Sequence, residues 1–198
     1  MSEVELPNPE ELEEQRGRAF TRRVALTTAI YAVVLAIASL GGNNATKEMM
    51  LAQQQASDLW AFYQAKAIRE HQYRTQRLRL EADLAERGTV MRPEARQKFE
   101  ALIAKFAEEE TRYSAEKKEI EKDAKQLEHE RDVNRAKDPY FDFGEALLQI
   151  AIVMSSIAIL SSSRSLFLFS LALALLGALL TINGYTLLFK LAFLHGGH

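Results

Sequence analysis

Three long apolar segments and one long polar segment make up most of the chain. The apolar segments cover residues 24–40, 146–160 and 166–188, and the polar segment lies between the first two. A helix needs about 20 apolar residues to cross the hydrocarbon core of a bilayer, with about 17 as the lower limit. The second segment is short, but the serines around it can bond to helix carbonyls and need not exclude a span. The pattern therefore predicts three transmembrane helices.

The first apolar segment has two interpretations, a retained anchor and a cleaved signal peptide. Ala36-Ile37-Ala38 fits the small-residue pattern of a cleavage site. However, the 23 residues ahead of the segment carry six acidic residues, unlike a short basic leader, so a retained anchor is favoured. Asn8-Pro9 and the glutamates that follow have the features of a helix start. We therefore expect a short surface helix ahead of the first span.

The basic residues beside the spans predict their orientation. Four arginines precede the first span and Arg164 lies between the second and third spans. Basic residues in short loops favour the cytoplasm. Four basic residues just before the second span argue weakly for the reverse: Lys125, Arg131, Arg135 and Lys137. We expect the N-terminus in the cytoplasm, with the polar segment and the C-terminus on the opposite face.

The polar segment carries a seven-residue repeat, which consists of Phe99, Phe106, Tyr113, Ile120 and Leu127. An apolar residue at every seventh position is typical of a coiled-coil seam. Residues 46–87 keep a similar spacing, but charged residues interrupt it. We predict two helical arms that pack as a coiled coil. The alternative is that each arm is a long helix that engages other subunits.

A marked turn separates the two arms. Gly88 suits a left-handed helix end, and Pro93 suits the first turn of the next helix. The arms, residues 46–87 and 93–134, have 42 residues each, and each arm would be about 63 Å long as a helix. Equal arms return the chain to the membrane face that it left. We therefore predict an antiparallel hairpin in which the numbers of facing residues sum to about 183.

This register also brings charged side chains together across the hairpin. It sets Arg74 against Glu109 and places Glu70 near Arg112. Exposed pairs of this kind stabilise by only a few tenths of a kcal/mol each. Complementary charges are therefore expected to flank the seam.

The predicted fold class is all-α, with three transmembrane helices and a long extramembrane antiparallel coiled-coil hairpin between the first and second. The predicted divisions are a cytoplasmic N-terminal segment (1–23), the first transmembrane helix (24–42), the hairpin (43–142, with its turn at 88–93), the second and third transmembrane helices (143–162 and 163–189) and a C-terminal tail (190–198).

Small side chains form a stripe on two of the predicted spans. The stripe on the first span is Ala25, Ala29, Ala32, Ala36 and Ser39, and that on the third is Ser170, Ala174, Gly177 and Thr181. Such stripes let helix backbones approach closely, although alanine is also simply common in membrane helices. Three thin helices and a two-helix rod offer little interior. We therefore expect a homo-oligomer in the lipid bilayer, with a further protein partner able to bind the hairpin.

Nothing in the sequence predicts an enzyme. The chain has no cysteine, and the predicted register places His71 and His129 far apart, so we expect no cofactor and no metal site. His195 and His198 are interpreted as part of a solvated tail. The net charge of −2 provides no basic tail for nucleic acid. Polar residues in or near a membrane core are functional candidates by default, and here they are Glu145, Gln149 and Asn183.

The densest group of aromatic and charged side chains lies at residues 58–73. Trp60 is the only tryptophan, and its neighbours place rings on several faces of one helix, more than a two-helix seam can bury. A contact with another subunit or partner and ordinary packing within the hairpin both account for the group. The interaction candidates are Asn43, Asn44, Trp60, Tyr63, Gln64, Lys66 and Arg69.

These residues also carry a family resemblance. Asn43-Asn44 follows an alanine-rich span, and the motif Trp60-Ala61-Phe62-Tyr63-Gln64-Ala65-Lys66 precedes the charged hairpin and the two C-terminal spans. This arrangement resembles a bacterial membrane protein family catalogued as a domain of unknown function, numbered four-three-three-seven. The resemblance covers nearly the whole chain. It implies a bacterial, membrane-embedded protein with no assigned activity, substrate or catalytic residue. With three predicted spans, we expect a multi-pass protein of the inner membrane.

The patterns favour a non-enzymatic membrane scaffold or interaction protein that presents a coiled-coil rod outside the bilayer. A small oligomeric channel or transporter is the alternative, and it requires polar residues along one face of a span. A third hypothesis is an accessory subunit of a membrane enzyme complex, in which a partner supplies the chemistry.

Overall fold

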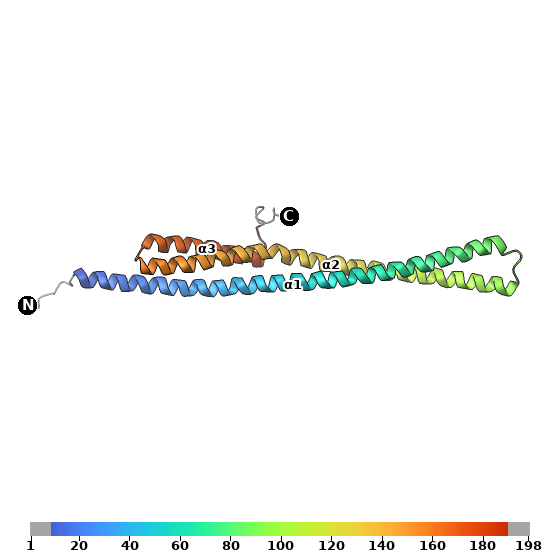
Figure 1. Cartoon of the computed structure of the whole chain (residues 1–198), viewed down its shortest axis with the longest axis horizontal. Coiled ribbons are helices and arrows are strands. Elements are labelled where there is room, and N and C mark those ends of the chain that lie inside the picture. Colours follow the sequence, from blue (N-terminus) through green and yellow to red (C-terminus); the bar gives the residue numbers. More distant parts are fainter. Residues whose placement is uncertain (1–8, 190–198) are drawn as a thin grey trace, which may run out of the picture. The chain divides into compact units, whose positions relative to one another are not determined.

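The computed structural model describes residues 9–189, and its regular elements over that range are all helices. They are α1 (Pro9–Arg87), α2 (Pro93–Leu160) and α3 (Arg164–Thr186) (Figure 1). The predicted all-α fold is confirmed. The predicted tail at 190–198, with His195 and His198, lies outside the described residues, as does Asn8 at the expected helix start.

The helices contribute to two compact units. The three-helix unit comprises Met1–Glu48 and Val133–His198, and the hairpin unit comprises Met49–Asp132. The three apolar segments all belong to the three-helix unit. The seven-residue repeat belongs to the hairpin unit.

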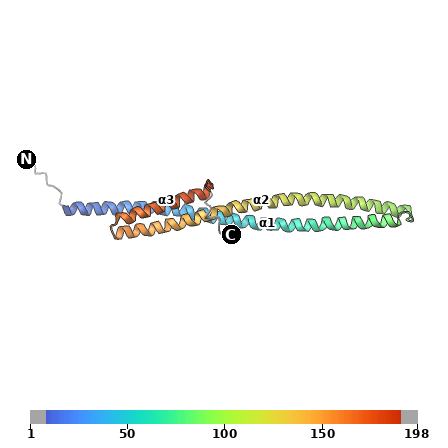
Figure 2. The ribbon, with the colours of Figure 1, turned by 90° about the horizontal axis from the view of Figure 1, so that it is seen from above.

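In the hairpin unit, α1 and α2 run side by side in opposite directions (Figure 1 and Figure 2). Helix α1 ends at Arg87 and α2 begins at Pro93, as the turn residues predicted. The expectation of a left-handed Gly88 was wrong, because no glycine among the described residues has a positive φ. Gly88 N–H instead donates to Leu84 O at 2.9 Å. A Cβ at Gly88 would lie 2.3 Å from that oxygen, so a close approach explains this glycine.

Contacts between the two arms report the register of the hairpin. Arg131 Nη1 donates to Gln53 Oε1 at 3.0 Å, and Arg69 Nη1 donates to Tyr113 Oη at 3.3 Å. Both pairs agree with the predicted register to within one residue. All five positions of the seven-residue repeat, residues 99 to 127, are buried or half-buried. The antiparallel pairing of the arms is therefore confirmed.

Two predicted charge pairs have other partners. Arg74 Nε lies 3.9 Å from Glu110 Oε1 rather than against Glu109. Glu70 accepts from Lys117 Nζ at 2.6 Å instead of Arg112. Long flexible side chains reach a neighbouring turn of the facing helix, so a register that is correct for the backbone does not fix which charges meet.

In the three-helix unit, α1 turns every seventh residue toward the other helices. Val24, Tyr31, Ala38 and Ala45 are all buried. Residues 9–23 are helical, as expected, but they form one continuous helix with the first apolar segment instead of a short helix of their own. Most of residues 10–23 favour a helix, and none of them is a proline that would interrupt α1. Pro139 stands inside α2 without ending that helix.

Helices α2 and α3 approach each other closely at two glycines. A Cβ on Gly177 would lie 2.9 Å from Gly144 O, and a Cβ on Gly144 would lie 2.8 Å from Thr181 Oγ1. Farther along the pair, the buried hydroxyls of Ser155 and Ser170 bond at 3.0 Å. The small-residue stripe of α3 is buried and is therefore a packing seam within the chain.

The small-residue stripe of α1 has a different environment. Ala25, Ala29, Ala32 and Ala36 are exposed, and Ser39 is half-buried. These alanines lie away from the buried positions of α1, so this chain leaves the stripe largely uncovered.

All three helices are long and apolar enough to cross a membrane. In the most apolar stretch of each, 22%, 28% and 22% of the residues are buried inside the chain. Large apolar side chains such as Leu26, Val153 and Leu179 are about 60% exposed. Most of the surface of these stretches therefore needs an apolar environment from outside the chain.

Candidate interaction surface

The tryptophan motif turns three of its seven side chains toward the facing arm. Trp60 Nε1 donates to Glu128 Oε1 at 3.0 Å, and the Trp60 and Tyr63 rings meet edge to face at 5.3 Å. One turn farther, Lys66 pairs with Glu116. Ordinary packing within the hairpin therefore accounts for Trp60, Tyr63 and Lys66.

Tyr113 lies at the centre of this inward face. Its ring is 5% exposed and stacks on Tyr73 at 5.6 Å. The guanidinium of Arg112 lies 4.8 Å from the ring centroid, and that of Arg69 lies 5.9 Å away, distances at which a cation and an aromatic face attract. The hydrogen bond from Arg69 lowers the pKa of the Tyr113 hydroxyl. The sequence candidate Arg69 therefore helps to hold the seam.

Half-buried ion pairs connect the two arms, Lys66 with Glu116 and Lys117 with Glu70. The hydrogen bond from Lys66 lowers the pKa of Glu116. In the same way, the bond to Glu70 raises the pKa of Lys117. Each charged form is therefore favoured in the folded hairpin.

Replacing Glu116 with glutamine is expected to destabilise the hairpin near neutral pH and to have little effect in acid. The folded pKa of Glu116 lies below its ordinary value of 4.5, so its ion pair stabilises above that pH and is lost as the pH falls through the folded value. Thermal unfolding of the full chain, followed by circular dichroism at several pH values, measures the difference between wild type and E116Q.

The exposed Glu119 provides the control for this experiment, because it forms no ion pair with any residue that the structure describes. The variant E119Q is expected to unfold like wild type throughout. A difference between wild type and E116Q that persists unchanged in acid would show that the ion pair does not cause it.

The outward face of the same segment of α1 is nearly free of charge, and Gln53, at its edge, accepts from Arg131 of α2. Between residues 50 and 68 the exposed positions are Met50, Leu51, Gln53, Gln54, Gln55, Ser57, Asp58, Ala61, Phe62, Gln64, Ala65 and Ile68. Asp58 is the only charged residue among these. The side chains of Met50, Phe62 and Ile68 are 63%, 61% and 59% exposed. We call these twelve residues the outward α1 face.

The facing segment of α2 has the opposite character. Its exposed positions between residues 115 and 132 are Ala115, Lys118, Glu119, Lys122, Asp123, Lys125, Gln126, His129, Glu130 and Asp132. Seven of these ten residues are charged. Depletion of charge distinguishes the core of protein interfaces from the remaining surface. The hairpin therefore has one face suited to water and one suited to a protein contact.

The other sequence candidates are divided between different places. Gln64 lies on the outward α1 face, and Asn43 and Asn44 are exposed in the three-helix unit. Phe62 was not among the candidates, although it stands inside the quoted motif. The sequence did hold a signal for Phe62. Trp60, Phe62 and Tyr63 lie within four residues of one helix, and rings at these positions cannot all point at one facing arm.

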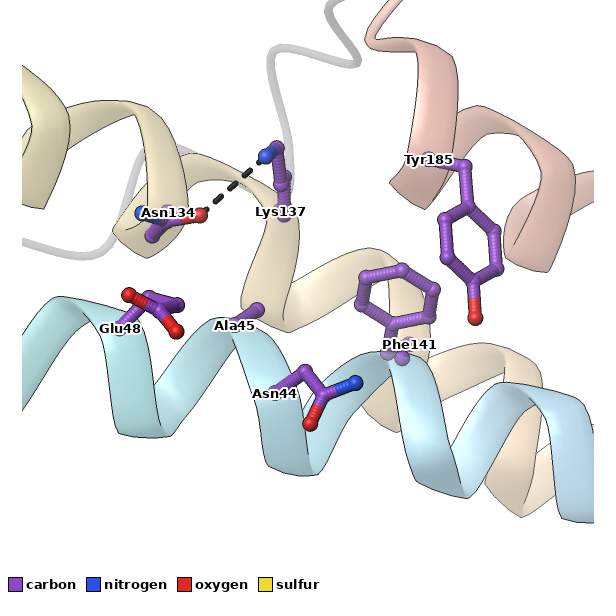
Figure 3. Close-up of a pocket in the computed structure, with 8 residues that line it drawn as sticks. Asn44, Ala45, Glu48, Asn134, Lys137, Phe141 and Tyr185 are labelled. Atoms are coloured by element: carbon purple, nitrogen blue, oxygen red, sulfur yellow. Dashed lines mark hydrogen bonds between the residues drawn. The ribbon is translucent and has the colours of Figure 1, made fainter.

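Asn44 lines a cleft in the three-helix unit, with a volume of about 190 Å³ (Figure 3). The cleft is bounded by Gly41, Asn44, Ala45 and Glu48 of α1, Asn134, Lys137 and Phe141 of α2, and Tyr185 of α3. Lys137 Nζ donates to Asn134 Oδ1 at 3.2 Å on its rim. Its floor is the pair of rings Phe141 and Tyr185, which meet edge to face at 4.9 Å.

Phe141 fits this place because three glycines make room for its ring. A Cβ on Gly41 would lie 2.4 Å from the ring, one on Gly42 would lie 3.2 Å from its Cβ, and one on Gly184 would lie 3.0 Å from the ring. Tyr185 Oη donates to Ile37 O at 3.1 Å and closes the junction. All three helices therefore meet at the Phe141 side chain.

Two of the three polar candidates of the spans bond to each other, and the third has other partners. Gln149 Nε2 donates to Glu145 Oε1 at 3.1 Å on α2. Asn183 is buried instead, where its amide donates to Phe189 O at 2.7 Å and accepts from Phe189 N–H at 2.9 Å. These two hydrogen bonds and the left-handed conformation of Leu187 accompany the end of α3 at Thr186, before the predicted limit of 189. Among the described residues, no acidic or histidine cluster could hold a metal ion.

One comparison with known proteins bears on this arrangement. The profile of a family described as Domain of unknown function (DUF4337) matches residues 20–187, most of the chain. The chain belongs to this family. The resemblance found in the sequence is confirmed, and the match extends through both units and all three helices. The description of DUF4337 assigns no activity. No curated protein and no solved structure matches the chain.

Proposed function

We propose that this chain is a non-enzymatic protein of the bacterial inner membrane that assembles with copies of itself and presents a coiled-coil rod outside the bilayer. In this proposal all three helices cross the membrane. The N-terminus is cytoplasmic, and the hairpin and the C-terminus lie on the opposite face. The protein acts as a scaffold, through the surfaces of its helices.

The observation that carries the proposal is the outward α1 face. A polar hairpin that needed only to be soluble would have charges on both of its outer faces, as α2 has. Phe62 and Ile68 are instead left exposed, about 120° apart around the helix, on a surface with one charged residue. Burying a large apolar side chain stabilises by about 1.5–3 kcal/mol, so this face favours a contact with another apolar surface.

A second copy of the chain is the proposed occupant of this face. Helix α1 leaves a further face uncovered in the three-helix unit, the alanines at positions 25, 29, 32 and 36. Close helix packing in membranes uses such small residues. Copies anchored in one bilayer also share an orientation and a high local concentration, which favours parallel contacts along α1. The dispersed polar candidates of the spans provide no comparable support for a pore.

The double substitution F62S/I68S tests this assembly. We expect the wild-type chain, purified in a mild detergent, to have the mass of a dimer or larger oligomer by light scattering. The variant is expected to dissociate about a hundredfold more readily, since two apolar anchors together contribute roughly 3 kcal/mol.

The control is L102S, which removes a partly exposed apolar side chain from α2 (Leu102 is 41% exposed) and is expected to leave the mass unchanged. A monomeric wild-type chain would refute assembly itself. An oligomer that F62S/I68S leaves intact would refute only the role of the outward α1 face.

A further inference from the structure

Three arginines converge at the end of the three-helix unit where α1 approaches the start of α3. Arg16 and Arg23 of α1 and Arg164 of α3 line one cleft of about 400 Å³. The aromatic side chains Phe20 and Phe167 lie between them, and their rings meet edge to face at 5.9 Å. The site thus combines a basic rim with an apolar floor.

The charges in this cleft have no partner among the side chains that the structure describes. None of the three guanidinium groups forms an ion pair or a side-chain hydrogen bond with a residue in the range 16–189. Three like charges around one cleft repel each other, and an anion placed among them removes that repulsion. Helix α3 begins at Arg164, so the positive end of its dipole adds to the potential.

The position of the arginines next to the apolar segments indicates which kind of anion the cleft would bind. Arg23 directly precedes the first apolar segment, and Arg164 stands just ahead of the third. With those segments in a bilayer, the guanidinium groups lie at the level of the lipid headgroups. Basic pockets between transmembrane helices bind anionic lipid headgroups on the cytoplasmic side. Phe20, Phe167 and Leu168 provide an apolar surface for the upper part of an acyl chain.

We propose that this cleft binds one anionic glycerophospholipid, with its phosphodiester among Arg16, Arg23 and Arg164 and an acyl chain against Phe20 and Phe167. The proposal shares with the proposed function only the placement of the helices in a bilayer. It does not require the hairpin to bind anything, so a monomeric protein would leave it intact.

Lipid binding to the purified full chain in nonionic detergent tests the site. Phosphatidylglycerol is the probe, phosphatidylcholine is the neutral comparison, and inorganic phosphate tests for a bare anion site. Native mass spectrometry measures the bound lipid. Wild type is expected to bind phosphatidylglycerol at least tenfold more tightly than phosphatidylcholine, and phosphate at the same concentration is expected not to displace it.

Two neighbouring arginines provide a matched pair of variants. Arg23 lines the cleft, whereas Arg22 is exposed and does not line it. The variant R23Q is expected to weaken phosphatidylglycerol binding about fivefold and R23Q/R164Q about thirtyfold, while R22Q changes it by less than twofold. The variant R23K/R164K keeps the charge and is expected to keep most of the binding.

Several outcomes would overturn the proposal. Equal weakening by R22Q and R23Q would show a diffuse effect of surface charge. Equal binding of phosphatidylcholine would remove the role of the anion, and displacement by inorganic phosphate would remove the role of the lipid. If R23Q/R164Q loses its helical circular dichroism signal, the comparison of R23Q with R22Q decides the question.

Discussion

Replacing Phe141 with alanine is expected to destabilise the three-helix unit by about 3 kcal/mol, within the usual cost of truncating a buried phenylalanine. The Phe141 ring is 1% exposed and fills the space that Gly41 and Gly184 leave open. The glycines that line the space have no side chain that could move into the resulting cavity. Thermal unfolding of the full chain in detergent, followed by circular dichroism, measures the loss.

Phe143 provides the control for this experiment. It lies two residues farther along α2, and its side chain is 51% exposed. The variant F143A is expected to unfold within about 1 kcal/mol of wild type, as substitutions away from a packed core usually do. Equal loss of stability in F141A and F143A would show that the glycine-lined space around Phe141 does not hold the three helices together.

Replacing Gly177 with leucine is expected to be similarly damaging, through steric overlap instead of a cavity. Even a Cβ at this position would lie 2.9 Å from Gly144 O and 2.9 Å from Leu148 Cγ. The backbone oxygen cannot rotate away, so α2 and α3 must separate. Overpacking of this kind costs about 3 kcal/mol, and the separation also weakens the bond between Ser155 and Ser170. The same unfolding measurement in detergent reports the loss.

Gly17 is the matched control, because a Cβ there meets nothing within 4 Å. The variant G17L is expected to be neutral or slightly stabilising, since leucine favours the helix more than glycine does. A G177L variant as stable as G17L would show that α2 and α3 do not depend on the close approach at Gly144.

Much of the fold follows from local signals in the sequence. The repeat from Phe99 to Leu127 and the residues of the turn specified two antiparallel arms and their register. Apolar periodicity depends on the helix repeat, and Gly88 and Pro93 act through the backbone geometry of the turn itself. Neither signal needs information about distant parts of the chain, so both could be read without a structure.

The candidate surfaces could be predicted only in part. The tryptophan motif marked the correct segment of α1, but the sequence pointed to Trp60, and the structure leaves Phe62 uncovered instead. The choice depends on which side of the helix the facing arm occupies. The Phe141 junction was missed entirely, although Gly41-Gly42 within an otherwise apolar helix was a signal that another side chain comes close.

The sequence by itself determined the helical fold, three segments able to cross a membrane, the position of the turn and the pairing register of the arms. These properties arise from periodicity and backbone chemistry within each segment. Only the tertiary structure decided which small-residue stripe is buried, which ring stays exposed and that Arg16, Arg23 and Arg164 share one cleft. Such properties depend on contacts between residues of different helices, such as Ser155 with Ser170 and Trp60 with Glu128, which are set when whole helices pack against one another.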